Sequence, residues 1–423
     1  MLCLDMAIQG TLPLRVDPST VFTPNAPIDV RALFRGRKSQ VQSVLRAVHQ
    51  KGQHAILFGE RGVGKTSLAN VIHSFLHDPS AATISPRVNC DSMDTFESVW
   101  RKAFDEVQME STIRQAGFAA EPRPVAYPAS DFLGDIVSPN SVRRALSILA
   151  RDTTTILIID EFDRLNRETK RGIADTIKTL SDHAVPATVV LVGVADSVDE
   201  LIEEHESIER ALVQVHMPRM SLEEISEIII GGLAKLDLVT TDRIKRKICT
   251  LAQGLPHYAH LIGLEAAQIA IDGNTAEVED SILEEAMYIA LRGSQASIQR
   301  SWHKATTSPR KDNLFSNVLI ACALAKTDEL GYFAPQDVRV PLSIILDRKM
   351  EIANYSQHLA DFCDEKRGPV MQRTGLERRY RFRFKNPLMQ PFVVMQGFSC
   401  GKISYELLEQ LTPEPSTELL PPF

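Results

Sequence analysis

Ala55-Ile56-Leu57-Phe58 is a short apolar run, and Gly59-Glu60-Arg61-Gly62-Val63-Gly64-Lys65-Thr66 follows it at once. The run is typical of a buried strand, and the residues after it match the pattern G-x-x-x-x-G-K-T in full. Glycines allow the backbone to turn so that successive N–H groups face phosphates, and a helix that starts near Thr66 would direct the positive end of its dipole at them. We therefore predict a phosphate-binding loop at residues 59–66.

The side chains of this loop predict a nucleotide and a metal ion as ligands. Lys65 would reach the β- and γ-phosphates, and Thr66 would offer its hydroxyl to Mg²⁺, which takes oxygen ligands. An accidental glycine-rich turn is the alternative, but the strand before it, the helix after it and the full spacing argue against that reading. We expect contacts to the nucleotide from Gly59, Arg61, Gly62, Val63, Gly64, Lys65, Thr66 and Ser67.

A second strand carries two acids at its carboxyl end. Residues 155–159 are apolar and β-branched without alternation, as expected for a strand buried on both faces of a parallel sheet, and Asp160-Glu161 follows. We predict that Asp160 holds Mg²⁺ through water and that Glu161 polarises the attacking water as general base. The alternative is a solvated acidic turn after a core strand.

A third strand is predicted at residues 188–194, and it places Asp196 at the same edge of the sheet. Asp196 would contact the attacking water or the γ-phosphate, or it would cap a helix over residues 198–204. The fold class predicted from these motifs is α/β, a parallel sheet with helices on both faces.

The composition excludes several classes of protein. A chain of 423 residues is long enough for two or three packed units, and 44% apolar with 24% charged residues is ordinary for a globular protein. The net charge of −7 argues against a wholly basic nucleic-acid binder, and six cysteines without a C-x-x-C pair suggest neither a zinc site nor a disulfide framework. The sequence shows neither a membrane-spanning apolar run nor a signal-peptide layout, so we expect a cytoplasmic protein.

The order of these motifs resembles the AAA+ superfamily, and within it the initiator clade that includes the origin-recognition ATPases, over roughly residues 20–400. The resemblance implies an ATPase that uses ATP and Mg²⁺. Phe34 and Arg35 lie in a segment similar to the one that packs on adenine in the family. Asp160-Glu161 matches the second Walker motif of the family, and Asp196 falls at the sensor-1 position, where asparagine is usual.

Two more site residues follow from the resemblance. Arg210 is placed like the arginine finger that a neighbouring subunit receives, which implies a homo-oligomer or hetero-oligomer. The alternative for Arg210 is a surface ion pair with a nearby glutamate. His257 lies where the sensor-2 motif has arginine, so it would be a titratable contact to the γ-phosphate or a structural residue.

The rest of the chain is predicted from periodicity. Lid helices are expected over 221–235, 242–252 and 256–272, with a capping box at Ser221-Leu222-Glu223-Glu224. The segment between Glu110 and Pro139 reads as a loop insertion. The predicted division is an extended segment at 1–33, the ATPase domain at 34–218, the lid at 219–300, a winged-helix-like domain at 301–400 and a flexible tail at 401–423.

The winged helix is expected from helices at 314–327, 336–346 and 350–365, followed by a hairpin. Residues 366–385 hold eight Lys/Arg against the single acid Glu377, a local excess able to meet phosphates of duplex DNA. The alternative is a solvated strand face in a protein-interaction domain. The DNA contacts would come from Arg373, Arg378, Arg379, Arg381 and Arg383.

These observations predict an oligomeric AAA+ ATPase, in which ATP controls a switch that engages DNA or a DNA-bound partner. The alternative is a signalling or scaffold ATPase, such as an antiviral or transposition regulator, whose carboxyl-terminal domain binds protein instead.

Overall fold

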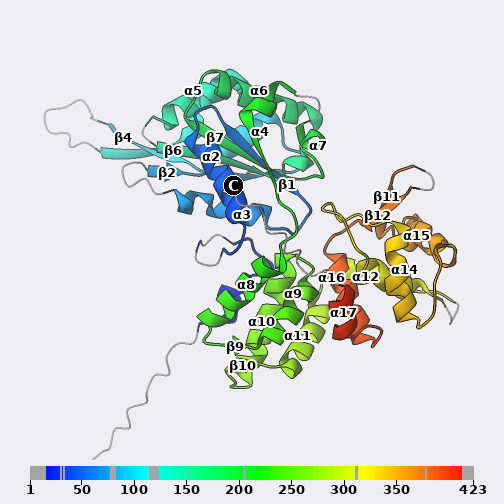
Figure 1. Ribbon diagram of the computed structural model, residues 1–423. Coiled ribbons are helices and arrows are strands. Elements are labelled where there is room, and N and C mark those ends of the chain that lie inside the picture. The colour runs from blue at the N-terminus through cyan, green and yellow to red at the C-terminus, as the bar shows by residue number, and fades with distance from the viewer. Residues whose placement is uncertain are drawn as a thin grey trace, which may run out of the picture.

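The central sheet is parallel and lies between two layers of helices (Figure 1). The computed structural model describes residues 16–28, 31, 34–76, 82–113, 123–151, 153–202, 206–309, 313–376 and 379–411. The strand order is β2-β6-β7-β1-β8, and β3 also pairs with β6 on the outer side. The strands of this sheet are β1 (His54–Gly59), β2 (Ala82–Ile84), β3 (Arg87–Asn89), β6 (Thr153–Asp160), β7 (Ala187–Val194) and β8 (Leu212–His216).

Successive residues of the central strands point into two different cores. Leu57 and Ile158 pack in the core beneath α2 (Lys38–His49) and α3 (Lys65–Val71), whereas Ile56 belongs to the core on the other face. That second core is covered by α4 (Phe96–Asp105), α5 (Pro139–Leu149) and α6 (Arg167–Asp182). Burial on both faces explains why these strands are continuously apolar, and it confirms the predicted α/β class. Short helical segments complete the layers at η1 (Ile72–Phe75), η3 (Phe162–Arg164), α7 (Asp199–Ile202) and η4 (Glu206–Ala211).

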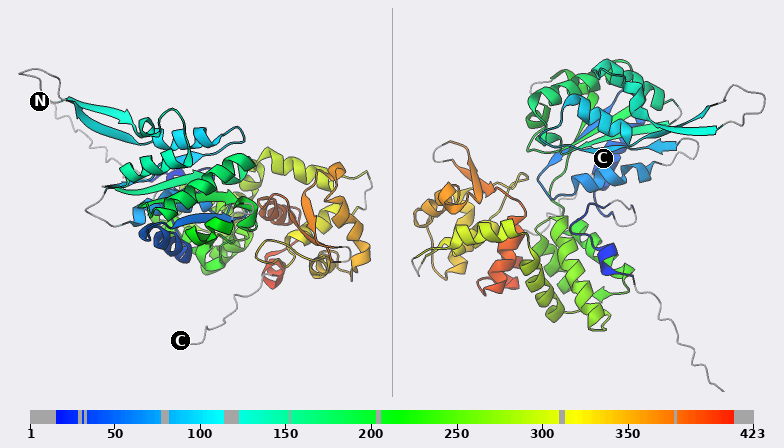
Figure 2. Two further views of the ribbon diagram at one scale, coloured as in Figure 1. Left: turned by 90° about the horizontal axis from the view of Figure 1, so that it is seen from above. Right: turned by 180° about the vertical axis from the view of Figure 1, so that it is seen from behind.

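The segment predicted as a loop insertion contains two strands, so that prediction was wrong for part of its length. β4 (Gln108–Ile113) and β5 (Arg123–Pro128) form an antiparallel hairpin that extends away from the sheet (Figure 2), and η2 (Ala129–Leu133) follows. Residues 114–122 lie outside the described residues. A two-stranded ribbon outside the main sheet is held by its own cross-strand pairs, so no apolar alternation marks it in the sequence.

The region predicted to be the lid is a bundle of helices below the sheet (Figure 1), and we call it the lid below. It consists of α8 (Leu222–Lys235), α9 (Asp242–Ala252), α10 (Pro256–Asp272) and α11 (Asp280–Gly293), with the short pair β9 (Val239–Thr240) and β10 (Glu277–Val278). The capping box is confirmed, because the Ser221 hydroxyl accepts from the Glu224 N–H at 3.2 Å and the Glu224 carboxylate accepts from the Ser221 N–H at 3.0 Å.

The amino-terminal segment was predicted to be extended, but its described part contains a short helix, α1 (Pro18–Val21), and docks on the lid. Phe22 is fully buried there against the two glycines Gly232 and Gly263. A Cβ atom at Gly232 would lie 2.2 Å from the Phe22 ring, so the ring fits only because the lid helices have no side chain at these two positions. A long-range contact of this kind leaves no periodic signal in the segment itself.

The carboxyl-terminal unit comprises residues 296–411 and lies beside the lid (Figure 2). The predicted helix at 314–327 is shorter and ends at Ala323. Beyond it, the Asp328 side chain accepts the N–H groups of Leu330 and Tyr332 and turns the chain. The predicted helix at 350–365 is broken into three pieces, since side chains cap local N–H groups at Glu351 and Lys366. Its elements are α12 (Ala296–Thr306), α13 (Phe315–Ala323), α14 (Pro335–Ile345), η5 (Ile352–Asn354), α15 (Ser356–Asp361), η6 (Glu365–Arg367), β11 (Met371–Thr374), β12 (Arg381–Phe384), α16 (Met389–Ser399) and α17 (Tyr405–Leu411).

The last helix corrects the predicted flexible tail, which was wrong for residues 405–411. Leu407 and Leu408 of α17 are buried, and the Lys247 ammonium of α9 lies 4.1 Å from the centre of the Tyr405 ring. Residues 412–423 lie outside the described residues. One continuous apolar core joins α3, the lid and the carboxyl-terminal unit. In the parts of the chain that the structure describes, every helix is too short or too polar to cross a membrane.

Candidate functional site

The loop after β1 has the backbone that its glycines predict. Gly59, Gly62 and Gly64 have backbone φ angles of 144°, 88° and 92°, which residues with a Cβ atom rarely adopt. A Cβ at Gly59 would also lie 2.4 Å from the carbonyl oxygen of Met217. The helix α3 begins at Lys65 with Gly64 as its N-cap, and no side chain caps it, so its first N–H groups face the loop.

Lys65 is buried under this loop. Its Nζ donates hydrogen bonds to the carbonyl oxygens of Gly59 at 3.0 Å and Glu60 at 2.7 Å. Burial lowers the pKa of the Lys65 ammonium to about 8, against the opposing effect of the nearby carboxylates Asp163 and Asp160. A cation with few water contacts favours an anionic ligand, because a phosphate would restore the charge compensation that water no longer provides.

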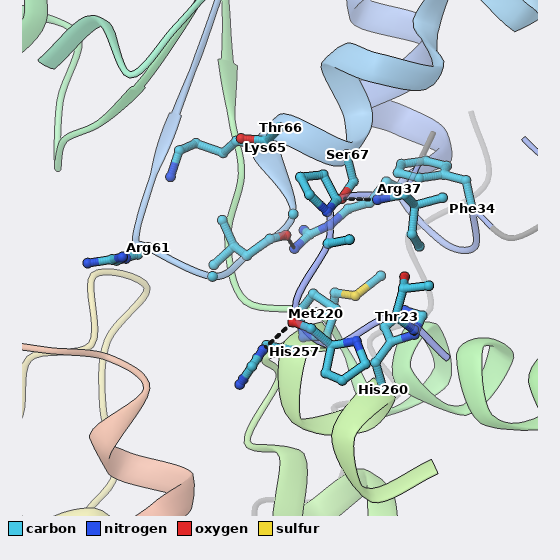
Figure 3. Close-up of a pocket in the computed structure, with 18 of the residues that line it drawn as sticks. Thr23, Phe34, Arg37, Arg61, Lys65, Thr66, Ser67, Met220, His257 and His260 are labelled. Carbon is cyan, nitrogen blue, oxygen red and sulfur yellow. Dashed lines mark hydrogen bonds between the residues drawn. The ribbon is translucent and has the colours of Figure 1, made fainter. Parts of the chain in front are cut away.

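A cavity of about 330 Å³ opens at this end of the sheet, between the loop, the amino-terminal segment and the lid (Figure 3). In Figure 3, Lys65 and Arg61 extend from the loop on the side away from Phe34. The predicted residues that line the cavity are Phe34, Arg35, Arg61, Gly62, Val63, Gly64, Lys65, Thr66, Ser67, Asp160, Glu161 and His257. Gly59, Asp196 and Arg210 belong to the predicted site but do not line it.

The two acids at the carboxyl end of β6 lie in different surroundings. Asp160 is 3% exposed, and its Oδ1 accepts from the Glu161 N–H at 2.8 Å while its Oδ2 accepts from Arg87 Nη2 at 3.0 Å. Glu161 has a positive φ of 55°, and its exposed carboxylate pairs with Arg164 at 2.7 Å. Because surface ion pairs contribute little, the pair with Arg164 leaves Glu161 able to turn toward a ligand.

His257 reaches the cavity from the lid, at the start of α10. Its Nδ1 lies 2.7 Å from the carbonyl oxygen of Pro24, so Nδ1 donates and the neutral ring has only an acceptor at Nε2. Burial lowers the pKa of His257, and the bond to Pro24 opposes this effect. A neutral His257 therefore cannot donate to a phosphate oxygen, and a sensor-2 contact would need the protonated ring.

The other two predicted residues lie away from the cavity. The Asp196 carboxylate accepts a hydrogen bond from Arg383 Nη1 of the carboxyl-terminal unit. Arg210 is exposed just before β8, at the end of the sheet opposite the phosphate-binding loop, because Leu212 pairs with His54 at the start of β1. Arg210 thus cannot reach the cavity of its own chain.

Three buried polar groups of the cavity were not predicted from the sequence. Arg37 is 2% exposed, and its Nη2 donates to the carbonyl oxygens of Val63 and Pro218. Its Nε and Nη1, the Thr23 hydroxyl and the Nε2 of His260 have no partner among the described residues. Buried polar groups are nearly always paired, so groups left over along one cavity are the ones that a polar ligand would satisfy.

These residues fit a nucleotide with its metal. The orphaned donors and the glycine backbone suit phosphates and a base, and the Thr66 hydroxyl with the Asp160 carboxylate suits a cation that prefers oxygen. Among the described residues, no group of three or more His, Cys, Asp or Glu side chains is arranged to hold a metal ion. Arg37 stands in the segment Phe34-Arg35-Gly36-Arg37, so its motif could have been detected, whereas Thr23 and His260 carry no local signal.

The fold and the cavity define a P-loop ATPase of the AAA+ type. The model of the family Novel STAND NTPase 1 matches residues 28–329, more than half of the chain, and the chain belongs to this family. No curated protein sequence matches it.

Solved structures share the fold. A Walker-type ATPase of Pyrococcus abyssi matches with a TM-score of 0.51 and 14% identity, over 87% of this chain and 98% of that one. The ORC2 protein of Aeropyrum pernix, in ADPNP–ADP complexes, matches with a TM-score of 0.48 and 13% identity, over 91% and 99% of the two chains. As a member of the Novel STAND NTPase 1 family, the protein is an ATP-hydrolysing enzyme, and its cofactors are ATP and Mg²⁺.

Proposed function

We propose that this ATPase is a switch in which the bound nucleotide controls the docking of the carboxyl-terminal unit onto the ATPase domain. The ion pair between Asp196 and Arg383 carries the proposal, because it joins the predicted sensor-1 position to the hairpin of the carboxyl-terminal unit. A change of the γ-phosphate near the end of β7 would thereby reach a unit that can engage a partner.

The site residues take the following roles in this proposal. Lys65 holds the β- and γ-phosphates, with backbone N–H groups of the loop on the same oxygens. Thr66 and Asp160 would hold Mg²⁺, which when bound would offset the negative charge of the phosphates, and Glu161 would orient the attacking water. Phe34 and Arg35 border the base. Arg210 would complete the cavity of a neighbouring copy, so hydrolysis would need an oligomer.

A second set of contacts fastens the carboxyl-terminal unit to the phosphate-binding loop. Arg219 Nε pairs with the Glu60 carboxylate of the loop at 2.8 Å, and Arg219 Nη1 donates to Gln390 Oε1 of α16 at 2.7 Å. The Tyr258 hydroxyl of the lid donates to the carbonyl oxygen of Leu388 at 2.6 Å, and Leu388 itself lines the cavity. The docked unit therefore contacts the loop, the lid and the cavity, so a change at the nucleotide could alter its docking. We call the contacts of Arg383 with Asp196 and of Arg219 with Glu60 and Gln390 the latch.

Breaking the latch tests this proposal. We expect Arg383→Glu to raise ATP turnover about 5–30-fold, because loss of roughly 1–2 kcal/mol shifts the docking equilibrium by that factor and frees the cavity mouth for a neighbouring Arg210. Small-angle scattering should show a larger radius of gyration for this variant, and Asp196→Arg combined with Arg383→Glu should restore both values. Arg339→Glu is the matched control, since Arg339 is exposed in the same unit and pairs with Glu351 at 3.9 Å. Unchanged turnover and size in Arg383→Glu would contradict the latch.

The partner proposed from the sequence is duplex DNA, bound by a winged helix. The order of three helices and a hairpin in residues 315–384 supports this assignment. In the docked unit the basic side chains are used internally: Arg373 lies over the Tyr380 ring at 4.3 Å and Arg381 pairs with Asp328 at 2.9 Å. Arg379 is exposed, and Arg378 lies outside the described residues. Undocking would release Arg383 from Asp196 of the ATPase domain and add it to the basic face offered to DNA.

Salt dependence of binding separates DNA from a protein partner. If the hairpin contacts phosphates, Arg381→Gln and Arg383→Gln should each reduce the slope of log K against log salt by about 1. Undiminished slopes would favour the second candidate, a protein partner. That candidate is supported by α15, which stands at the position of a recognition helix yet contains Asp361 and neither Lys nor Arg.

The proposal also includes a cytoplasmic location. It places the domain boundaries near residues 218 and 300, as predicted from the sequence.

A further inference from the structure

Arg87 on the edge strand β3 contacts the carboxylate that the proposed function assigns to the metal. Its Nη2 donates to Asp160 Oδ2 at 3.0 Å and to Asn89 Oδ1 at 2.8 Å, and its Nη1 donates to Asn70 Oδ1 of α3 at 2.7 Å. The side chain of Asp160 is 5% exposed and that of Arg87 is 28% exposed. The guanidinium therefore bridges α3, β3 and β6 beside the phosphate-binding loop.

The surroundings show that the contact acts chiefly through charge. Leu68 and Ala69 fix α3 in one core, and Ile158 and Ile159 fix β6 between two cores, so the position of Thr66 relative to Asp160 does not depend on one surface arginine. Asp160 is too buried for water to screen it fully, and a unit charge at hydrogen-bond distance then changes its effective charge strongly.

The other charged groups near Asp160 do not replace Arg87. Lys65 donates its hydrogen bonds to the carbonyl oxygens of Gly59 and Glu60, and Glu161 pairs with Arg164. Asp163 Oδ1 accepts from the Val194 N–H at 2.8 Å. Arg87 is thus the cation that hydrogen-bonds to the Asp160 carboxylate in the described structure.

We propose that Arg87 is a positioning residue that acts as the internal counter-ion of Asp160 and lowers the affinity of the site for Mg²⁺. The Arg87 guanidinium and the hydrated cation compete for the Asp160 carboxylate, so a hydrogen bond to one weakens the interaction with the other. The inference rests on the proposed role of Asp160. It implies that Arg87 raises the Mg²⁺ concentration needed for half-maximal nucleotide binding.

Binding of a fluorescent ADP analogue to the full chain, titrated with Mg²⁺, tests the proposal. We expect Arg87→Gln to lower the Mg²⁺ concentration for half-maximal binding by about tenfold, and Arg87→Lys, which keeps the charge, to lower it less than about threefold. With EDTA present, Arg87→Gln should bind the analogue as weakly as wild type or more weakly, because a positive charge near the phosphates is lost. Tighter binding with Mg²⁺ but not in EDTA is the signature of a charge effect, since a purely structural defect would weaken binding in both.

Two controls keep the outcomes distinct. Arg101→Gln removes a half-buried arginine of α4 whose hydrogen bonds go to Glu97 and to the carbonyl oxygen of Gly134, and its Mg²⁺ dependence should be that of wild type. Asp160→Asn should raise the required Mg²⁺ concentration. If it does not, the proposed role of Asp160 fails; if it does but Arg87→Gln matches wild type or weakens binding in both conditions, the inference about Arg87 alone is overturned. Thermal unfolding of each variant, without nucleotide, shows whether it is folded.

Discussion

Replacing Glu161 by Gln is expected to lower ATP turnover by about 10²–10³-fold, while the affinity for ATP changes by less than about threefold. The amide keeps the size of the side chain but cannot accept a proton from the attacking water. Binding should persist, because the groups that we propose to face the phosphates are the glycine backbone, Lys65 and Thr66 of the loop. Phosphate release under saturating ATP, together with equilibrium binding of an ATP analogue, measures the two effects separately.

The matched control for this variant is Glu168→Gln, at an exposed position in the first turn of α6. It makes the same chemical change outside the cavity and should retain full turnover. If Glu161→Gln kept half of the wild-type turnover or more, Glu161 would not be the general base. The ion pair of Glu161 with Arg164 has both side chains about half exposed, so its loss in the variant should barely affect stability.

Lys65→Ala is expected to weaken ATP binding by at least about 100-fold, because it removes a buried charge that faces the phosphates and leaves the carbonyl oxygens of Gly59 and Glu60 without their donor. Lys51→Ala, at an exposed turn before β1, is the matched control and should bind as wild type. Isothermal titration with ATP and Mg²⁺ gives both affinities. Wild-type affinity in the Lys65→Ala variant would show that the loop does not hold the phosphates.

The pKa of Lys65 adds a pH dependence to this prediction. Burial lowers that pKa to about 8, so the free protein carries a charged Lys65 below pH 8 and increasingly loses the proton above it. Bound phosphate favours the charged form and raises the pKa, so binding takes up a proton at alkaline pH and the affinity should fall as the pH rises through 8. The Lys65→Ala variant should lack this decline. An equal decline in the variant would assign it to another group.

Much of the ATPase domain could be predicted because its signals are local. The phosphate-binding loop, the apolar strands β6 and β7, and the lid helices α9 and α10 follow from adjacent residues or from helical periodicity, and the structure places them as expected. The same holds for residues 61–67 and for Asp160, Glu161 and His257, which line one cavity. Glycine spacing and strand-end acids constrain the nearby backbone directly, so no knowledge of distant residues is needed.

The sequence by itself determined the class of fold, the nucleotide loop and the pair of acids, because each depends on backbone geometry within a few residues. Only the tertiary structure decided that Arg383 pairs with Asp196, that Arg87 holds Asp160 and that Arg37 is buried at the cavity. These contacts join residues 187, 73 and 26 positions apart, respectively. The sequence around an arginine does not show which group its side chain will contact. Only the packing of the cores brings Arg383 and Arg87 to their carboxylates and buries Arg37 at the cavity.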